Sequence, residues 1–115
     1  MEIKIKRIYE EPDKKDGMRI LIDKLWPRGM AKENADIDLW LKDIAPSSDL
    51  RKWFGHDPKK WTEFCKRYYK ELALNQEPVK HLLDIVKKHK IITLLYAAKD
   101  EEFNNAIRYL EHLIL

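Results

Sequence analysis

The sequence of 115 residues has little of what several classes of protein require. Its single cysteine, Cys65, excludes an internal disulfide and a zinc site built from several cysteines. Its three glycines are too few for a glycine-rich phosphate-binding loop. No run approaches the roughly 18 apolar residues of a membrane span, and the first residues lack the apolar stretch of a secretory signal. We therefore expect a cytoplasmic protein without membrane association, and we predict no cofactor and no metal site.

Charge of one sign is not in large excess either. The chain carries 23 lysines and arginines against 20 acidic residues, a formal net charge of +3, and the two signs are interspersed. A nucleic-acid-binding domain usually gathers its basic residues in a stripe. The dense basic stretch here, residues 87–90, ends a predicted helix, where cations interact favourably with the helix dipole. Nucleic acid is therefore only the second choice of partner.

The apolar residues are sufficient for one hydrophobic core. They make up 44% of the chain, which predicts a single folded domain over residues 1–115. Ile3 and Ile5 alternate with lysines, which predicts a strand over about 2–9 with one face exposed to solvent. A short apolar run predicts a more buried strand over about 18–24. Residues 91–98 are apolar on both faces, which is typical of a central parallel strand.

Helical spacing of apolar residues predicts five helices, over about 33–44, 48–54, 58–73, 78–89 and 101–114. Their ends carry local signals: Ser47 as a cap, Gly55 as a stop, and Asp57 followed by Pro58 as a start. The predicted fold is a small α/β domain whose three-stranded, mostly parallel sheet is packed by helices. The eight-residue connector after the first strand leaves that strand's orientation open, and the oligomeric state is open too.

Polar residues follow all three predicted strands. Ligands of open parallel sheets bind beyond the carboxyl ends of the strands, so these residues are the candidate ligand-binding site: Arg7, Trp26, Arg28, Lys99, Asp100 and Asn104. Cations and a helix N-terminus that meet at one edge would bind an anion. Asp100 is explained first as a helix cap.

Two residues are candidates for catalysis. Asp23 ends a buried strand, where a carboxylate needs a partner such as Arg28 or Arg7, so a structural ion pair and a catalytic acid or base are both open. His56 lies between two predicted helices, where it either moves a proton near neutral pH or bonds the nearby backbone. Two tryptophans at predicted loop edges, Trp26 and Trp53, are candidates to line a pocket or to stack on bases.

Three stretches of the sequence resemble one known family. Residues 20–29 read Ile-Leu-Ile-Asp-Lys-Leu-Trp-Pro-Arg-Gly, and residues 40–57 and 94–106 also agree. They are similar to the YeaO-like branch of the domain-of-unknown-function family numbered 488. The resemblance covers nearly the whole chain and implies a compact cytoplasmic α/β domain without an established activity.

The polar positions that the resemblance implies largely coincide with the strand-end set. They are Asp23, Trp26, Arg28, Gly29, His56, Lys99 and Asn104. Longer relatives carry a Cys and a Cys-His pair around the last strand and helix, where this chain has Tyr96 and two asparagines. This difference argues against thiol chemistry here.

These observations lead to a hypothesis with an alternative. The protein binds a small phosphate- or nucleotide-like anion at the carboxyl edge of the sheet, with enzymatic activity left open. The alternative is a nucleic-acid-binding or protein-interaction module without catalysis.

Overall fold

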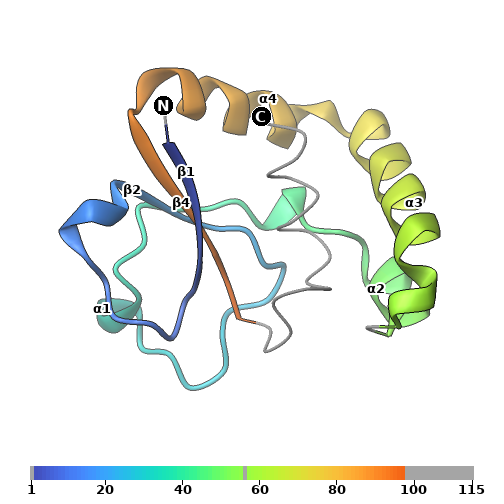
Figure 1. Ribbon diagram of the computed structural model, residues 1–115, viewed down its shortest axis with the longest axis horizontal. Helices are drawn as coiled ribbons and strands as arrows, with labels where there is room; N and C mark the ends of the chain where they lie inside the picture. The colour runs from blue at the N-terminus through green and yellow to red at the C-terminus, as the bar shows by residue number, and fades with distance from the viewer. Residues whose placement is uncertain (1, 56, 98–115) are drawn as a thin grey trace.

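The computed structural model describes residues 2–55 and 57–97. They form a four-stranded parallel sheet in the order β1–β4–β2–β3 (Figure 1). The strands are β1 (Glu2–Arg7), β2 (Met18–Leu21), β3 (Leu39–Trp40) and β4 (Ile91–Tyr96). Both β1 and β2 run parallel to β4, which answers the open question of the first strand's direction. The predicted α/β class with a parallel sheet is confirmed, with one strand more than the sequence indicated.

In the described part of the chain, four α-helices and three short 3-10 helices surround the sheet. The α-helices are α1 (Lys32–Ala35), α2 (Ser48–Phe54), α3 (Trp61–Leu74) and α4 (Gln76–Lys88), and the 3-10 helices are η1 (Lys14–Asp16), η2 (Lys42–Ile44) and η3 (Pro58–Lys60). The boundaries of α2 match the prediction because both of its caps are local. Ser47 Oγ accepts a hydrogen bond from Leu50 N, and Gly55 ends the helix at φ 54°. The predicted helix over 101–114 lies outside the described residues.

The predicted helix over 33–44 is wrong. This segment contains α1, β3 and η2, and Asp36, with φ 48°, follows the short helix α1. Trp40 and Leu41 have the spacing of a helical stripe, but they face different cores, because Trp40 packs with Leu21 and Leu41 packs with Ile20. Side chains that alternate between two faces are a property of a strand. The short strand β3 was missed because two residues carry too little periodicity.

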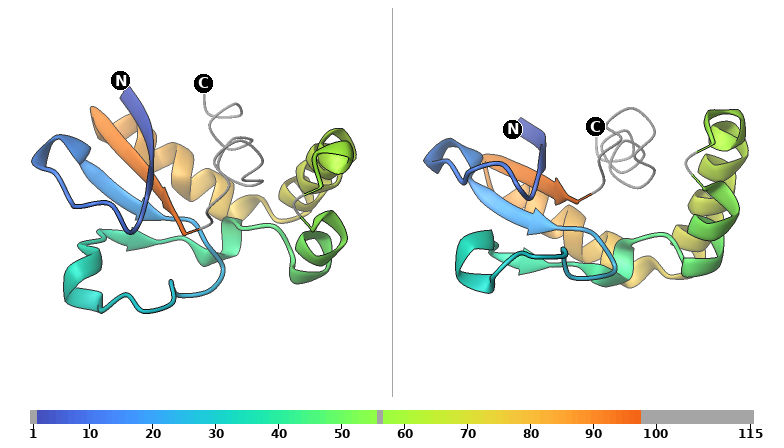
Figure 2. Two further views of the ribbon diagram at one scale, coloured as in Figure 1. Left: turned by 60° about the horizontal axis from the view of Figure 1, so that its bottom comes forward. Right: turned by 90° about the horizontal axis from the view of Figure 1, so that it is seen from below.

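The sheet buries a different core on each face. Ile20, Ile92 and Leu94 face the larger core, which α2, α3 and α4 complete. Leu21 and Leu95 face the smaller one, which the connection from β2 to β3 covers with α1. The two connections that leave β2 and β3 therefore cover opposite faces. The strand arrows of β2 and β4 point toward the end of the molecule where α2 and α3 lie (Figure 2).

A buried ion cluster supports the sheet on the side of the smaller core. Arg19 is 3% exposed, and its Nη1 atom lies 2.5 Å from Oδ2 of Asp16, which is 4% exposed. Its other two nitrogens donate to the carbonyls of Asp36 and Ala35, at 2.8 and 2.9 Å. Lys6 Nζ is the second cation on Asp16, at 3.1 Å. Every nitrogen of this buried guanidinium therefore has a partner, as a buried charge requires.

Candidate functional site

Asp23 connects three strands at the carboxyl edge of the sheet. It lies two residues beyond β2, and its Oδ2 atom accepts a hydrogen bond of 2.8 Å from the N–H of Ala97, just beyond β4. Its carbonyl accepts a hydrogen bond of 2.6 Å from Nε1 of Trp40 in β3. The sequence analysis placed Asp23 at this edge and expected Arg28 or Arg7 as the partner of its carboxylate. Neither forms an ion pair with Asp23 among the described residues.

The cation that acts on Asp23 comes from α2. Burial raises the pKa of the Asp23 carboxyl above its ordinary value of 3.8, and the hydrogen bond from Ala97 and the positive charge of Arg51 oppose this rise without cancelling it. Arg51 Nε is buried and has no hydrogen-bond partner within residues 2–55 and 57–97. Arg51 and Asp23 form no salt bridge, so the guanidinium acts on the carboxylate through space. No sequence pattern indicates Arg51, because its position depends on how α2 packs.

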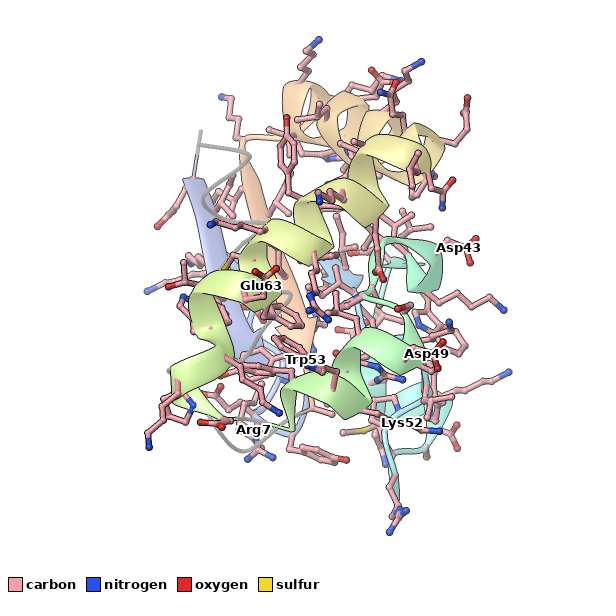
Figure 3. The ribbon with its side chains drawn as sticks, turned by 90° about the vertical axis from the view of Figure 1, so that its right-hand side faces the viewer. Arg7, Asp43, Asp49, Lys52, Trp53 and Glu63 are labelled. Carbon is pink, nitrogen blue, oxygen red and sulfur yellow. The ribbon has the colours of Figure 1, made fainter. Side chains whose placement is uncertain are left out.

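Arg7 and Arg28 both lie at this edge, but they differ in their contacts and in their exposure to solvent. Nη2 of Arg7 donates to the carbonyl of Ala97 at 2.9 Å, and its guanidinium lies 5.1 Å from the centre of the Tyr9 ring. Tyr9 in turn donates from its hydroxyl to the carbonyl of Arg28, at 2.8 Å, while the Arg28 residue itself is exposed. This hydrogen bond connects the loop after β2 to the segment that follows β1. Figure 3 shows Arg7 and Lys52 toward the same end of the molecule.

The two tryptophans proposed for stacking are already engaged within the fold. Trp26 donates from Nε1 to the carbonyl of Met30 at 2.7 Å and packs edge-on against Trp40, with ring centres 5.4 Å apart. Trp53 is half-buried and has Lys60 and Arg67 over its ring, at 5.1 and 4.0 Å (Figure 3). Both rings therefore already have partners within the fold.

A crevice of about 390 Å³ opens beside this edge, between the segment that follows β3 and the C-terminal half of α3, with Lys24 beyond β2 at its rim. Lys24 follows β2, and Lys42 and Asp43 follow β3, so both strand ends contribute charged side chains. Ser47 and Glu71 line it from the helical side. Sequence reasoning missed Glu71, which lies on α3 far along the chain from both strands.

The remaining candidates contribute little chemistry or lie elsewhere. Cys65 is half-buried, and burial raises the pKa of its thiol, which disfavours the reactive thiolate. Within the described residues, no group of three or more His, Cys, Asp or Glu side chains could hold a metal ion. No helix in this part of the chain is long and apolar enough to cross a membrane. Four candidates lie outside the described residues and stay predictions: His56, Lys99, Asp100 and Asn104.

Comparison with known proteins gives one family and relatives without an assigned activity. Residues 2–115 match the family DUF488-N3i, described as the inactive DUF488-N3 subclade. The uncharacterized protein YeaO of Escherichia coli is 43% identical over 107 residues, which cover 93% of this chain and 92% of that protein. The uncharacterized protein Rv3073c of Mycobacterium tuberculosis is 43% identical over 70 residues, covering 61% of this chain and 59% of that protein. No solved structure matches.

Proposed function

The chain belongs to the inactive DUF488-N3 subclade, and from this premise we propose that it is a non-catalytic domain that binds a small phosphate-like anion at the carboxyl edge of its sheet. Arg51 is the residue that contacts the anion. The description of the subclade as inactive favours binding without turnover over an enzyme. A cytoplasmic location, expected from the sequence, is part of the same proposal.

One observation carries this proposal: the buried Nε atom of Arg51 has no hydrogen-bond partner among the residues that the structure describes. Buried donors of arginine are almost always paired, and leaving one unpaired costs about 1–3 kcal/mol. Arg19 in the same chain follows the rule, since each of its nitrogens has an acceptor. A phosphate oxygen would supply the missing acceptor of Arg51, because a guanidinium matches phosphate geometry with two parallel N–H donors.

Asp23 belongs to the site as an organising group rather than as a catalyst. Its Oδ2 atom is bonded to Ala97 N and therefore holds the end of β4. The carboxylate also weakens the positive field around Arg51, so the anion must contact the guanidinium directly. Arg7, Arg28 and the strand-end residues outside the described part of the chain remain candidates for further contacts.

The test is an amide-resolved NMR titration with inorganic phosphate, pyrophosphate and ADP, each at low and at moderate salt. We expect shifts centred on residues 22–24, 51 and 97. Arg51→Gln should weaken binding at least about tenfold, because a hydrogen bond to a charged group contributes about 1.5–3 kcal/mol. Lys52→Gln is the matched control: it removes the same charge from the next residue of α2, which is exposed, and should change affinity less than about twofold.

Two outcomes would overturn the proposal. The first is that none of the three anions binds the wild-type protein. The second is that Arg51→Gln binds them as the wild type does. A single-stranded oligonucleotide is added as a third arm, and diffuse, strongly salt-dependent shifts in that arm alone would replace the anion site with a nucleic-acid surface.

A further inference from the structure

The crevice lined by Lys24, Lys42 and Glu71 lies beside the carboxyl edge of the sheet, where the topology favours a ligand. The connection after β2 covers one face of the sheet and the connection after β3 covers the other. Adjacent parallel strands whose connections leave toward opposite faces open a crevice at their carboxyl ends, and open α/β sheets bind ligands there. The volume of about 390 Å³ suits a small molecule. Neither Arg51 nor Asp23 lines this crevice, so the inference does not rest on the anion site.

The crevice contains charges of both signs. Lys24 and Lys42 supply two ammonium groups, and Asp43 and Glu71 supply two carboxylates. None of the four forms a salt bridge with another residue in the described ranges. Lys42 lies over the ring of Trp40, 5.4 Å from its centre, instead of pairing with an acid. Four charges of balanced sign therefore line one cavity without neutralising each other.

Glu71 is the most firmly placed of these groups. Its Oε1 atom accepts a hydrogen bond of 2.9 Å from Ser47 N, and its Oε2 atom accepts one of 2.5 Å from Ser47 Oγ. Each oxygen of a carboxylate can accept a second hydrogen bond. The carboxylate is thus held at the wall of the crevice by neutral donors, and no cation of the described residues forms a salt bridge with it.

We propose that this crevice binds a small zwitterion, with the α-amino acids as the chemical class. Glu71 binds the ammonium group of the ligand, and Lys24 and Lys42 bind its carboxylate. An anion alone would meet the repulsion of Glu71 and Asp43, and a cation alone would meet the two lysines. A ligand with both charges at the short separation of an amino acid satisfies both sets at once, and charge-assisted hydrogen bonds give this pairing its strength.

The experiment titrates the full chain with each of the twenty α-amino acids, and then with acetate and ethylammonium as single-charge probes. Binding is followed by NMR shifts of residues 24, 42–47 and 71. We expect at least one amino acid to bind about tenfold or more tightly than either single-charge probe. The combined change Lys24→Gln and Lys42→Gln should weaken that binding at least tenfold, and both lysines are exposed, so the fold should be retained.

Two further variants separate the role of Glu71 from its bonds to Ser47. Glu71→Gln should also weaken binding at least tenfold, with the folded state checked by its melting transition and amide spectrum. Asp43→Asn lowers the negative charge of the crevice without touching Ser47 and should weaken ammonium recognition less. Lys52→Gln is the control that should leave amino-acid affinity unchanged, and Arg51→Gln is measured beside it to test the anion site separately.

The proposal is overturned if no amino acid binds, or if acetate binds as tightly as the best amino acid, since the crevice would then be a plain anion site. It is also overturned if the double lysine variant binds as the wild type does. Loss of phosphate binding in Arg51→Gln with intact amino-acid binding would support two separate sites. The two proposals therefore fail on different variants.

Discussion

Removing the charge of Asp16 should destabilise this protein more than any other single change of charge considered. The substitution Asp16→Asn keeps the size of the side chain and removes the negative charge that faces Arg19. Both groups are almost fully buried, and Arg19 Nη1 lies 2.5 Å from Asp16 Oδ2. Arg19 would keep its two carbonyl acceptors but would hold an uncompensated buried charge.

The magnitude follows from that burial. Removing one partner of a buried ion pair costs about 3–5 kcal/mol. We expect the lower end, about 3 kcal/mol, because the carbonyls of Asp36 and Ala35 still solvate the guanidinium. For a chain of this size, that loss lowers the melting temperature by roughly 10–15 °C. Lys6→Gln is the comparison: its side chain is 18% exposed, so the change should cost only about 1 kcal/mol.

The assay is urea unfolding followed by tryptophan fluorescence across a range of pH. Burial by itself raises the pKa of Asp16, but the hydrogen bonds from Asp13 N–H, Lys6 and Arg19 outweigh it and hold the pKa below 3.8. A lowered pKa in the folded state means that the charged carboxylate stabilises the fold above pH 3.8 and that this contribution is lost as the pH falls through the folded pKa. The gap between wild type and Asp16→Asn should therefore be constant near neutral pH and close in acid.

A measured loss below about 1 kcal/mol at pH 7 would refute the reasoning, and so would a gap that widens in acid. A double variant with Arg19→Met provides a second check. If the two side chains interact directly, the pair of substitutions must cost less than the sum of the single ones. If the losses in free energy of unfolding simply add, Asp16 and Arg19 have no direct interaction energy.

Three other predictions test different parts of the fold. Asp23→Asn should stabilise the protein at pH 7 and not below about pH 4. The pKa of Asp23 is raised in the folded state, so the wild type loses stability as the pH rises above 3.8. Urea unfolding at several pH values tests this, and a variant less stable than the wild type at pH 7 would contradict it. Gly17→Ala should lower the free energy of unfolding by about 3 kcal/mol or more, since Gly17 has a positive φ and the new Cβ would overlap a backbone carbonyl of β4. Gly29 also has a positive φ but has open space around it, so Gly29→Ala should cost about 1 kcal/mol. Equal melting temperatures of the two variants would refute the steric argument. Tyr68→Phe should cost about 1–3 kcal/mol, because the buried hydroxyl donates to a backbone carbonyl of η2 at 2.5 Å, and a cost near zero by denaturant titration would show that this bond contributes nothing.

The elements that the sequence predicted are those whose signals are local. The central strand β4 was predicted from a continuous apolar run, and α2 from its caps at Ser47 and Gly55. The segment around Trp40 was misassigned because its apolar residues serve two cores, a fact that only the packed sheet contains. The spacing of apolar residues indicates an element type when one face of that element is buried. The prediction fails where both faces are apolar.

The candidate site was predictable to the same extent. The rule that ligands bind at the carboxyl ends of parallel strands placed Asp23 at the right edge from the sequence alone. Arg51 and Glu71 were not predicted. They reach the edge from α2 and α3, and the way a helix packs cannot be predicted from the sequence of that helix alone. The expected pairing of Asp23 with Arg28 or Arg7 failed for the same reason.

The contrast between Arg19 and Arg51 is the physical reason for proposing Arg51, and not Arg19, as the residue that binds an anion. Arg19 is the more deeply buried, yet each of its nitrogens has an acceptor, so its burial is compensated within the fold. Arg51 keeps a buried Nε without an acceptor, beside a carboxylate whose pKa is raised by burial. Both features oppose stability, and they occur together at the carboxyl edge of a parallel sheet. Local costs of this kind concentrate at functional sites, so the unpaired donor of Arg51 among the described residues supports the proposed anion site.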